Sequence, residues 1–208
     1  MAYSITVIGV GPGSPDFLTP AGSRALAQAD LVVGAKRLLI TFAQPHQEVY
    51  PLGADLAEAA EFIRRKSEEK QVAVLVSGDT GLYSFADYLA ERLPADRLTL
   101  VPGISSVQLM FARLKRPWQE AVIISRHGRQ DRRLIQLVQS GLVVAVLTDR
   151  YNTPQLLAAE LLTAGCQDLP VAVGCNLSYD DETIYRGKLS SLRESTEQFV
   201  NCVVVIGV

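Results

Sequence analysis

Three glycines near the start of the chain have almost the spacing of a nucleotide-binding loop. Gly9, Gly11 and Gly13 lie in VIGVGPGSPDFLT (residues 7–19), between a β-branched run and a predicted helix. A dinucleotide-binding loop needs G-x-G-x-x-G, but Ser14 takes the place of the third glycine. Pro12 also removes one of the backbone N–H groups that would hold a phosphate. The loop therefore disfavours a dinucleotide. Its glycines allow a bulky ligand to approach closely, or form a tight turn that binds nothing.

Two further loops carry small and polar residues at the ends of predicted strands. They are VSGDTGLYS (76–84) and VPGISS (101–106), and each precedes a predicted helix. Right-handed connections in a parallel sheet place such loops at the same edge as the first one. Asp79, Thr80, Ser105 and Ser106 would supply polar contacts there. Each loop could also be an ordinary turn, and Ser105 is a good helix N-cap in any case.

A basic stretch follows in the middle of the chain. Residues 113–133 contain seven arginines or lysines and two acidic residues. Arginine binds carboxylates through two parallel hydrogen bonds, so we expect Arg126 and Arg129 to hold an acidic substrate. His127 could move a proton or simply donate a hydrogen bond. Solvated surface is the ordinary alternative for the remaining basic candidates, which are Lys36, Arg37, Arg132 and Arg133.

The numbers and spacing of histidines and cysteines give little support for a catalytic nucleophile or a metal site. The chain has two histidines, and the spacing of Cys166, Cys175 and Cys202 matches neither a CxxC motif nor a metal site. We interpret these cysteines as small buried apolar groups in a reducing compartment. We expect no Ser-His-Asp or Cys-His arrangement and no metal site.

Composition indicates one large or two small globular domains. The chain has 208 residues, 48% of them hydrophobic and 20% charged, with a formal net charge of −2. This charge gives no overall attraction to nucleic acid. The N-terminal residues lack the basic start of a signal peptide, and no apolar run reaches the ~20 residues of a membrane span. We expect a soluble, cytoplasmic protein that acts on neither nucleic acid nor membranes.

The elements that must position these residues alternate between strand and helix, which is typical of an α/β fold. Near residue 115, RLKRPWQE combines charge, a proline and the only tryptophan. We therefore predict two α/β domains, 1–115 and 116–208, with a ligand cleft between them. The predicted strands are 4–10, 31–34, 71–78, 97–103, 121–128, 142–149, 169–177, 182–189 and 201–208, with 48–52 extended. The predicted helices are 19–30, 35–43, 54–70, 82–93, 105–114, 131–141 and 152–165.

Taken together, four motifs resemble the tetrapyrrole methylases, the S-adenosylmethionine-dependent enzymes of cobalamin and sirohaem synthesis. They are GVGPGSPDFLT (9–19), SGDTGLYS (77–84), VPGISS (101–106) and the terminal VVVIGV, so the resemblance spans nearly the whole chain. Within the family, residues 29–39 and 118–129 are similar to the members that methylate a corrin precursor at C5. The resemblance implies an S-adenosylmethionine donor, a tetrapyrrole substrate and a homodimer. It also implies a separate enzyme that methylates C15 and decarboxylates.

The resemblance also assigns individual residues. The glycine loop, with Gly9, Gly11 and Gly13, would shape the tetrapyrrole side of the cleft, where Arg126, Arg129 and the candidate catalytic residue His127 are expected. Ser77 replaces the first glycine of the family's GGD loop, and Thr80 replaces the proline that follows it. The implied donor contacts are Pro12, Ser77, Gly78, Asp79, Leu82, Ser105, Ser106, Leu147 and Leu177.

Two other functions remain open at this point. A methylase of the same fold could act on ribosomal RNA or on a protein, in which case binding to RNA would weaken steeply with salt. The protein could also be a nucleotide-binding module without enzymatic activity, but such a module would need the G-x-G-x-x-G pattern, which this loop does not match. Residues 29–39 and 118–129 favour the tetrapyrrole substrate.

Overall fold

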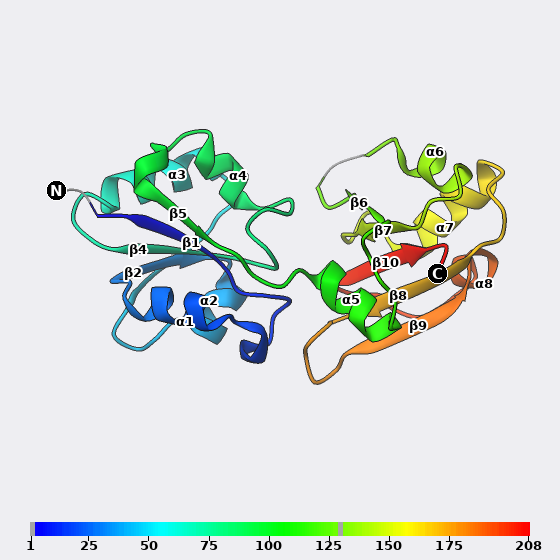
Figure 1. The fold of residues 1–208 in the computed structure, drawn as a ribbon, viewed down its shortest axis with the longest axis horizontal. Coiled ribbons are helices and arrows are strands. Elements are labelled where there is room, and N and C mark those ends of the chain that lie inside the picture. The colour runs from blue at the N-terminus through cyan, green and yellow to red at the C-terminus, as the bar shows by residue number, and fades with distance from the viewer. Residues whose placement is uncertain (1–2, 129–130) are drawn as a thin grey trace. The chain divides into compact units, whose positions relative to one another are not determined.

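Each half of the chain forms a five-stranded sheet of its own (Figure 1). The computed structural model describes residues 3–128 and 131–208, and it divides into Met1–Ser105 and Ser106–Val208. The sequence analysis placed the division later, after residue 115. The difference comes from helix α5 (Ser106–Leu114), which packs against strand β10 of the second sheet. We call these parts the first and second units.

The sheet of the first unit is entirely parallel, with strand order β3-β2-β4-β1-β5. Parallel sheets are covered on both faces, which explains the nearly continuous apolar runs in the sequence. Every residue of β2 and β4 is buried. The strands are β1 (Ile5–Gly9), β2 (Leu31–Gly34), β3 (Glu48–Pro51), β4 (Val72–Val76) and β5 (Leu98–Val101).

Helices cover both faces of this sheet (Figure 1). Helices α1 (Pro20–Ala27) and α2 (Lys36–Phe42) pack on the face that contains Ile8. Helices α3 (Leu56–Lys66) and α4 (Phe85–Ala90) pack on the opposite face. Short 3-10 turns, η1 (Pro15–Phe17) and η2 (Ala95–Arg97), complete the unit. Thr19 caps α1 by accepting a hydrogen bond from Gly22 N at 3.0 Å, as a threonine before proline predicts.

The second sheet is mixed, with strand order β6-β7-β10-β8-β9. Only β6 and β7 pair in parallel; β10 runs antiparallel to both β7 and β8, and β8 antiparallel to β9. The core lies under α6 (Leu134–Gln139), α7 (Pro154–Thr163) and α8 (Leu189–Arg193). The strands are β6 (Val122–Ser125), β7 (Val144–Leu147), β8 (Pro170–Cys175), β9 (Thr183–Lys188) and β10 (Cys202–Ile206).

The predicted α/β class is confirmed, and the principal differences are local. Helix α8 was not predicted because its five residues are too few to show a helical period. No helix in the described part of the chain is long and apolar enough to cross a membrane. All three cysteines are free and buried, and two of them, Cys175 and Cys202, lie directly opposite each other in the β8–β10 ladder.

Candidate functional site

The three glycine loops of the first unit meet at one edge of its sheet. They follow β1, β4 and β5, which are parallel neighbours. A Cβ atom at Gly103 would lie 2.3 Å from the carbonyl oxygen of Gly78 and 2.4 Å from that of Gly9. Only a residue without a side chain fits such a contact. The expectation that these loops converge is therefore confirmed, and Gly103 is the residue in contact with both of the others.

The first and second loops are also joined by a pair of backbone hydrogen bonds. Gly78 N donates to Gly11 O at 2.7 Å, and Gly11 N donates to Gly78 O at 3.2 Å. Both glycines have positive φ angles, +83° and +69°, which side chains rarely adopt. The resemblance assigned Gly11 to the substrate side and Gly78 to the donor side. The structure makes them direct neighbours, next to the buried Pro12 and Gly13.

Asp79 fastens the second loop to the third. Its Oδ2 atom accepts a hydrogen bond from Gly103 N at 3.0 Å, and its Oδ1 atom accepts one from Gly81 N at 2.8 Å. The carboxylate therefore holds the backbone of two loops in place. It was predicted as a donor contact, and its hydrogen bonds to Gly81 and Gly103 are those of a positioning group.

The remaining predicted donor residues of the first unit lie on the same loops. Ser77 accepts a hydrogen bond from the guanidinium of Arg37, which is part of α2. Serine at this position thus connects the loop to a helix, which glycine could not do. Leu82 is half-buried and Ser105 is buried. Ser106 is the first residue of α5 and belongs to the second unit.

A second carboxylate organises the loops after β6 and β7 in the second unit. Oδ2 of Asp149 accepts a hydrogen bond from Gly128 N at 2.7 Å. Its Oδ1 atom accepts hydrogen bonds from Tyr151 N and Asn152 N, both at 2.8 Å. Hydrogen bonds from backbone N–H groups, first of all that of Gly128, lower the pKa of Asp149. Asn152 Nδ2 closes the network by donating to Arg126 O at 2.8 Å.

The sequence analysis missed Asp149 and Asn152, although a signal was available. Asp149 ends the run VVAVLTD just as Asp79 ends VAVLVSGD, so both are carboxylates that follow a buried strand. In each unit that carboxylate ties its own loop to the loop of a nearby strand.

His127 lies within this network with its ring orientation fixed. Its Nδ1 atom is 3.1 Å from the carbonyl oxygen of Thr148, and its backbone N donates to Ser125 Oγ at 3.2 Å. A carbonyl oxygen only accepts hydrogen bonds, so Nδ1 must carry the proton. In the neutral ring the lone pair is then on Nε2. Because the residue is exposed, this nitrogen is available to accept a proton.

Arg126 differs from the role expected of it. Its side chain is buried, with 6% of the residue exposed, and Nη2 pairs with Oε1 of Glu160 on α7 at 2.8 Å. Nε has no hydrogen-bond partner among the described residues. A buried positive charge requires a negative partner, and here Glu160 provides it. The guanidinium therefore points toward α7 and is not exposed at the end of the strand. Arg129, predicted beside it, lies outside the described residues.

Leu147 and Leu177 lie at the same end of the second sheet. Leu147 is opposite Val203 in the β7–β10 ladder, and the next pair toward this end is Cys202 with Cys175 of β8. Leu177 follows β8 and is buried against Gly174. Thr148 Oγ1 donates to Cys202 O at 2.8 Å and links the two strand ends. Among the described residues, no group of three or more His, Cys, Asp or Glu side chains could hold a metal ion.

Comparison with known proteins identifies related sequences along almost the whole chain. The family model for tetrapyrrole (corrin/porphyrin) methylases matches residues 4–193. A cobalt-precorrin-7 C(5)-methyltransferase from Salmonella typhimurium is 30% identical over 202 residues, covering 97% of this chain and 98% of that protein. A probable cobalt-precorrin-7 C(5)-methyltransferase from Methanocaldococcus jannaschii is 31% identical over 196 residues, covering 91% and 90%.

A solved structure shares the fold. The uroporphyrin-III C-methyl transferase from Thermus thermophilus, complexed with S-adenosylhomocysteine, has a TM-score of 0.78 at 20% identity. The match covers 98% of this chain and 97% of that one.

Proposed function

Because the chain belongs to the tetrapyrrole methylase family, we propose that it methylates C5 of cobalt-precorrin-7 in cobalamin biosynthesis. The observation that carries this assignment is the match to two cobalt-precorrin-7 C(5)-methyltransferases over nine-tenths or more of each chain. S-adenosylmethionine is the methyl donor. The Thermus structure of the same fold, which contains S-adenosylhomocysteine, supports this choice.

We assign donor binding to Pro12, to the loops after β4 and β5, and to the predicted contacts of the second unit. The close backbone contacts at Gly9, Gly78 and Gly103 hold the three loops against one another without side chains between them, which supports a preformed site at this edge. Asp79 keeps two of these loops in register. In the second unit, the assigned contacts are Ser106, Leu147 and Leu177.

We assign the tetrapyrrole side to the glycine loop and to residues 126–129. Bound S-adenosylmethionine supplies a methyl group on a sulfonium centre, so the protein needs no nucleophile of its own. Its main contribution is to hold methyl and carbon in line, which can be worth ~7–11 kcal/mol. Nε2 of His127 can accept the proton released from the ring. Because Arg126 is paired with Glu160, Arg129 remains the candidate for gripping a substrate carboxylate.

The assembly and cellular context extend the same proposal. We infer a homodimer in the cytoplasm, and a separate enzyme that methylates C15 and decarboxylates the product. These inferences depend on the family resemblance.

An assay with cobalt-precorrin-7 and donor labelled in its methyl group tests the proposal. We expect one labelled methyl per substrate, located at C5. Calorimetry should give saturable binding of S-adenosylmethionine and S-adenosylhomocysteine but not of NAD. Label transferred to RNA or to a protein instead would overturn the substrate assignment, and tight binding of NAD alone would overturn the activity.

A further inference from the structure

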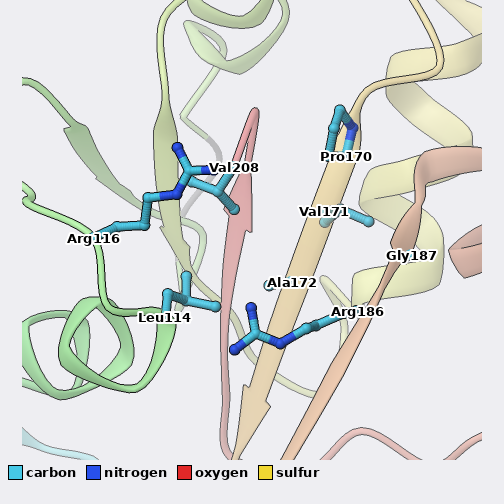
Figure 2. A pocket seen from close by; sticks show the side chains of 8 residues that line it. All are labelled: Leu114, Arg116, Pro170, Val171, Ala172, Arg186, Gly187 and Val208. Carbon is cyan, nitrogen blue, oxygen red and sulfur yellow. The ribbon is translucent and has the colours of Figure 1, made fainter.

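A pocket of about 290 Å³ opens in the second unit at the end of the sheet opposite His127, Leu147 and Leu177 (Figure 2). It lies where α5 ends and β8 begins, and Pro170 is part of its lining. Pro170 and Cys175 are the two ends of β8, so at ~3.3 Å per residue they are about 16 Å apart. The pocket is therefore distinct from the donor contacts assigned to the far end of the same strand.

Two arginines with no carboxylate partner face this pocket. Arg116 and Arg186 enter it from opposite sides (Figure 2). Within residues 3–128 and 131–208, neither forms an ion pair, whereas the neighbouring Arg113 pairs with Glu182 at 2.6 Å. Two positive groups around one hollow repel each other, and an anion bound between them would remove that cost.

Arg186 is already held in position. Its Nη2 atom lies 3.4 Å from the carbonyl oxygen of Arg113 in the last turn of α5. Carbonyls at a helix C-terminus lack partners within the helix and favour cations, so this long contact favours the observed position of the guanidinium. A guanidinium has five N–H donors, and most of them remain available to a ligand.

The floor of the pocket is apolar. Ala172 lies directly opposite Arg186 in the β8–β9 ladder, so both side chains are on the same face of the sheet. The short alanine side chain leaves space there, and the side chain of Leu114 borders it. The lining thus combines two arginines with a short apolar surface, and Val208, the last residue of the sequence, completes it.

We propose that this pocket binds a small dicarboxylate, with one carboxylate on Arg116, the other on Arg186, and an aliphatic spacer over Leu114 and Ala172. Guanidinium groups bind carboxylates through paired hydrogen bonds. Two guanidinium groups on opposite sides match two separate carboxylates better than one compact tetrahedral anion. Neither the donor nor the ring carbon to be methylated takes part in this site.

The test is calorimetric titration of the full chain with succinate, glutarate, adipate and inorganic phosphate. We expect saturable binding of at least one dicarboxylate, weakened by added salt, with phosphate bound at least about tenfold more weakly. Arg116→Gln and Arg186→Gln should each weaken binding by about tenfold or more, since each removes a charged hydrogen-bonding group. Arg193→Gln, an exposed arginine at the end of α8, is the matched control and should bind like the parent.

The affinity for S-adenosylhomocysteine is measured in the same variants. It should be unchanged, which shows that the variants are folded and that the pocket is separate from the donor site. Absence of saturable dicarboxylate binding overturns the proposal, as does equal affinity in the parent and both pocket variants. Equally tight phosphate binding, or simultaneous loss of S-adenosylhomocysteine binding, also contradicts it. None of these results bears on methylation at C5, which has its own assay.

Discussion

Asp79 and Asp149 show how one residue type can hold the loops at one edge of a sheet together. Each carboxylate follows a buried strand and accepts a backbone hydrogen bond from the loop after another strand, from Gly103 N at 3.0 Å and from Gly128 N at 2.7 Å. An ionised carboxylate only accepts hydrogen bonds, so it suits a place where several N–H groups converge. Such residues set the geometry within which other groups react.

Asp149→Asn should destabilise the protein by about 1–3 kcal/mol. The substitution replaces one acceptor oxygen by an NH₂ group that would face a backbone N–H. Urea unfolding at neutral pH measures the change, and Asp180→Asn, at an exposed aspartate, serves as the control. Equal stability of the two variants would contradict the role assigned to Asp149.

The effect of Asp149 should also depend on pH. Its pKa in the folded protein is lowered, first by the hydrogen bond from Gly128. Its charged form therefore stabilises the fold above the ordinary aspartate pKa of about 3.9, and this contribution is lost as the pH falls toward the folded-state value. The stability difference between parent and Asp149→Asn should shrink as the pH is lowered below about 4. A difference that stays constant there would mean that the charge is not responsible.

His127 is expected to accelerate methyl transfer without being essential. Positioned proton transfer typically contributes roughly 10²–10⁴-fold, so His127→Ala should slow single-turnover methylation by no more than about that range. His127→Asn keeps a donor group near the Thr148 carbonyl but removes the base at Nε2. A similar loss in both variants assigns the effect to proton transfer, whereas a loss confined to alanine assigns it to loop structure. A methylated protein residue that forms and decays at the catalytic rate would overturn direct transfer.

At the scale of elements, local pattern was sufficient for the strands but not for the contacts between loops. Buried runs such as VAVLV in β4 predict strands because a strand that is buried on both faces consists almost entirely of apolar residues. The direction of the Arg126 side chain could also have been predicted, from the alternation of side chains along a strand. Strand alternation places residue 126 on the face of Ile124, which is the face covered by α6, α7 and α8.

The contacts between loops could not be predicted from the local sequence pattern. The contacts of Gly103 join residues far apart in the chain, and Asp79 and Asp149 acquire their roles from partners that only the fold supplies. The family motifs placed the predicted donor residues of the first unit correctly on the loops after β1, β4 and β5. Whether those residues contact the donor remains a prediction.

Gly103→Ala should abolish or strongly weaken binding of S-adenosylhomocysteine. Its Cβ atom would lie 2.3 Å and 2.4 Å from two backbone oxygens, which cannot rotate away as a flexible side chain would. The loops after β1 and β4 must therefore shift. Gly53→Ala is the matched control, because a Cβ there meets nothing within 4 Å. Calorimetry on both variants, with circular dichroism to verify folding, measures the effect. Parent-like affinity in a folded Gly103→Ala protein would contradict the assignment of the loops after β4 and β5 to the donor.

At the scale of the whole molecule, each unit has its own hydrophobic core. One core cluster lies in the second unit, and the two of the first unit occupy opposite faces of its sheet. The assigned donor contacts are divided between the units: Pro12, Ser77, Gly78, Asp79, Leu82 and Ser105 in the first, and Ser106, Leu147 and Leu177 in the second. A ligand that uses both sets should therefore stabilise both cores.

Thermal unfolding with S-adenosylhomocysteine tests this expectation on the intact chain. At a ligand concentration one hundred times its Kd, binding to the folded state alone adds about 2.7 kcal/mol. For a chain of this size, each kcal/mol raises Tm by about 2–4 °C, so Tm should rise by about 5–11 °C. NAD should give no comparable rise in Tm. In the Gly103→Ala variant, S-adenosylhomocysteine should no longer raise Tm. Hydrogen exchange locates the effect, with slower exchange expected both at residues 77–82 and near Leu177. Slower exchange in only one unit would restrict the donor site to that unit and remove the assigned contacts of the other.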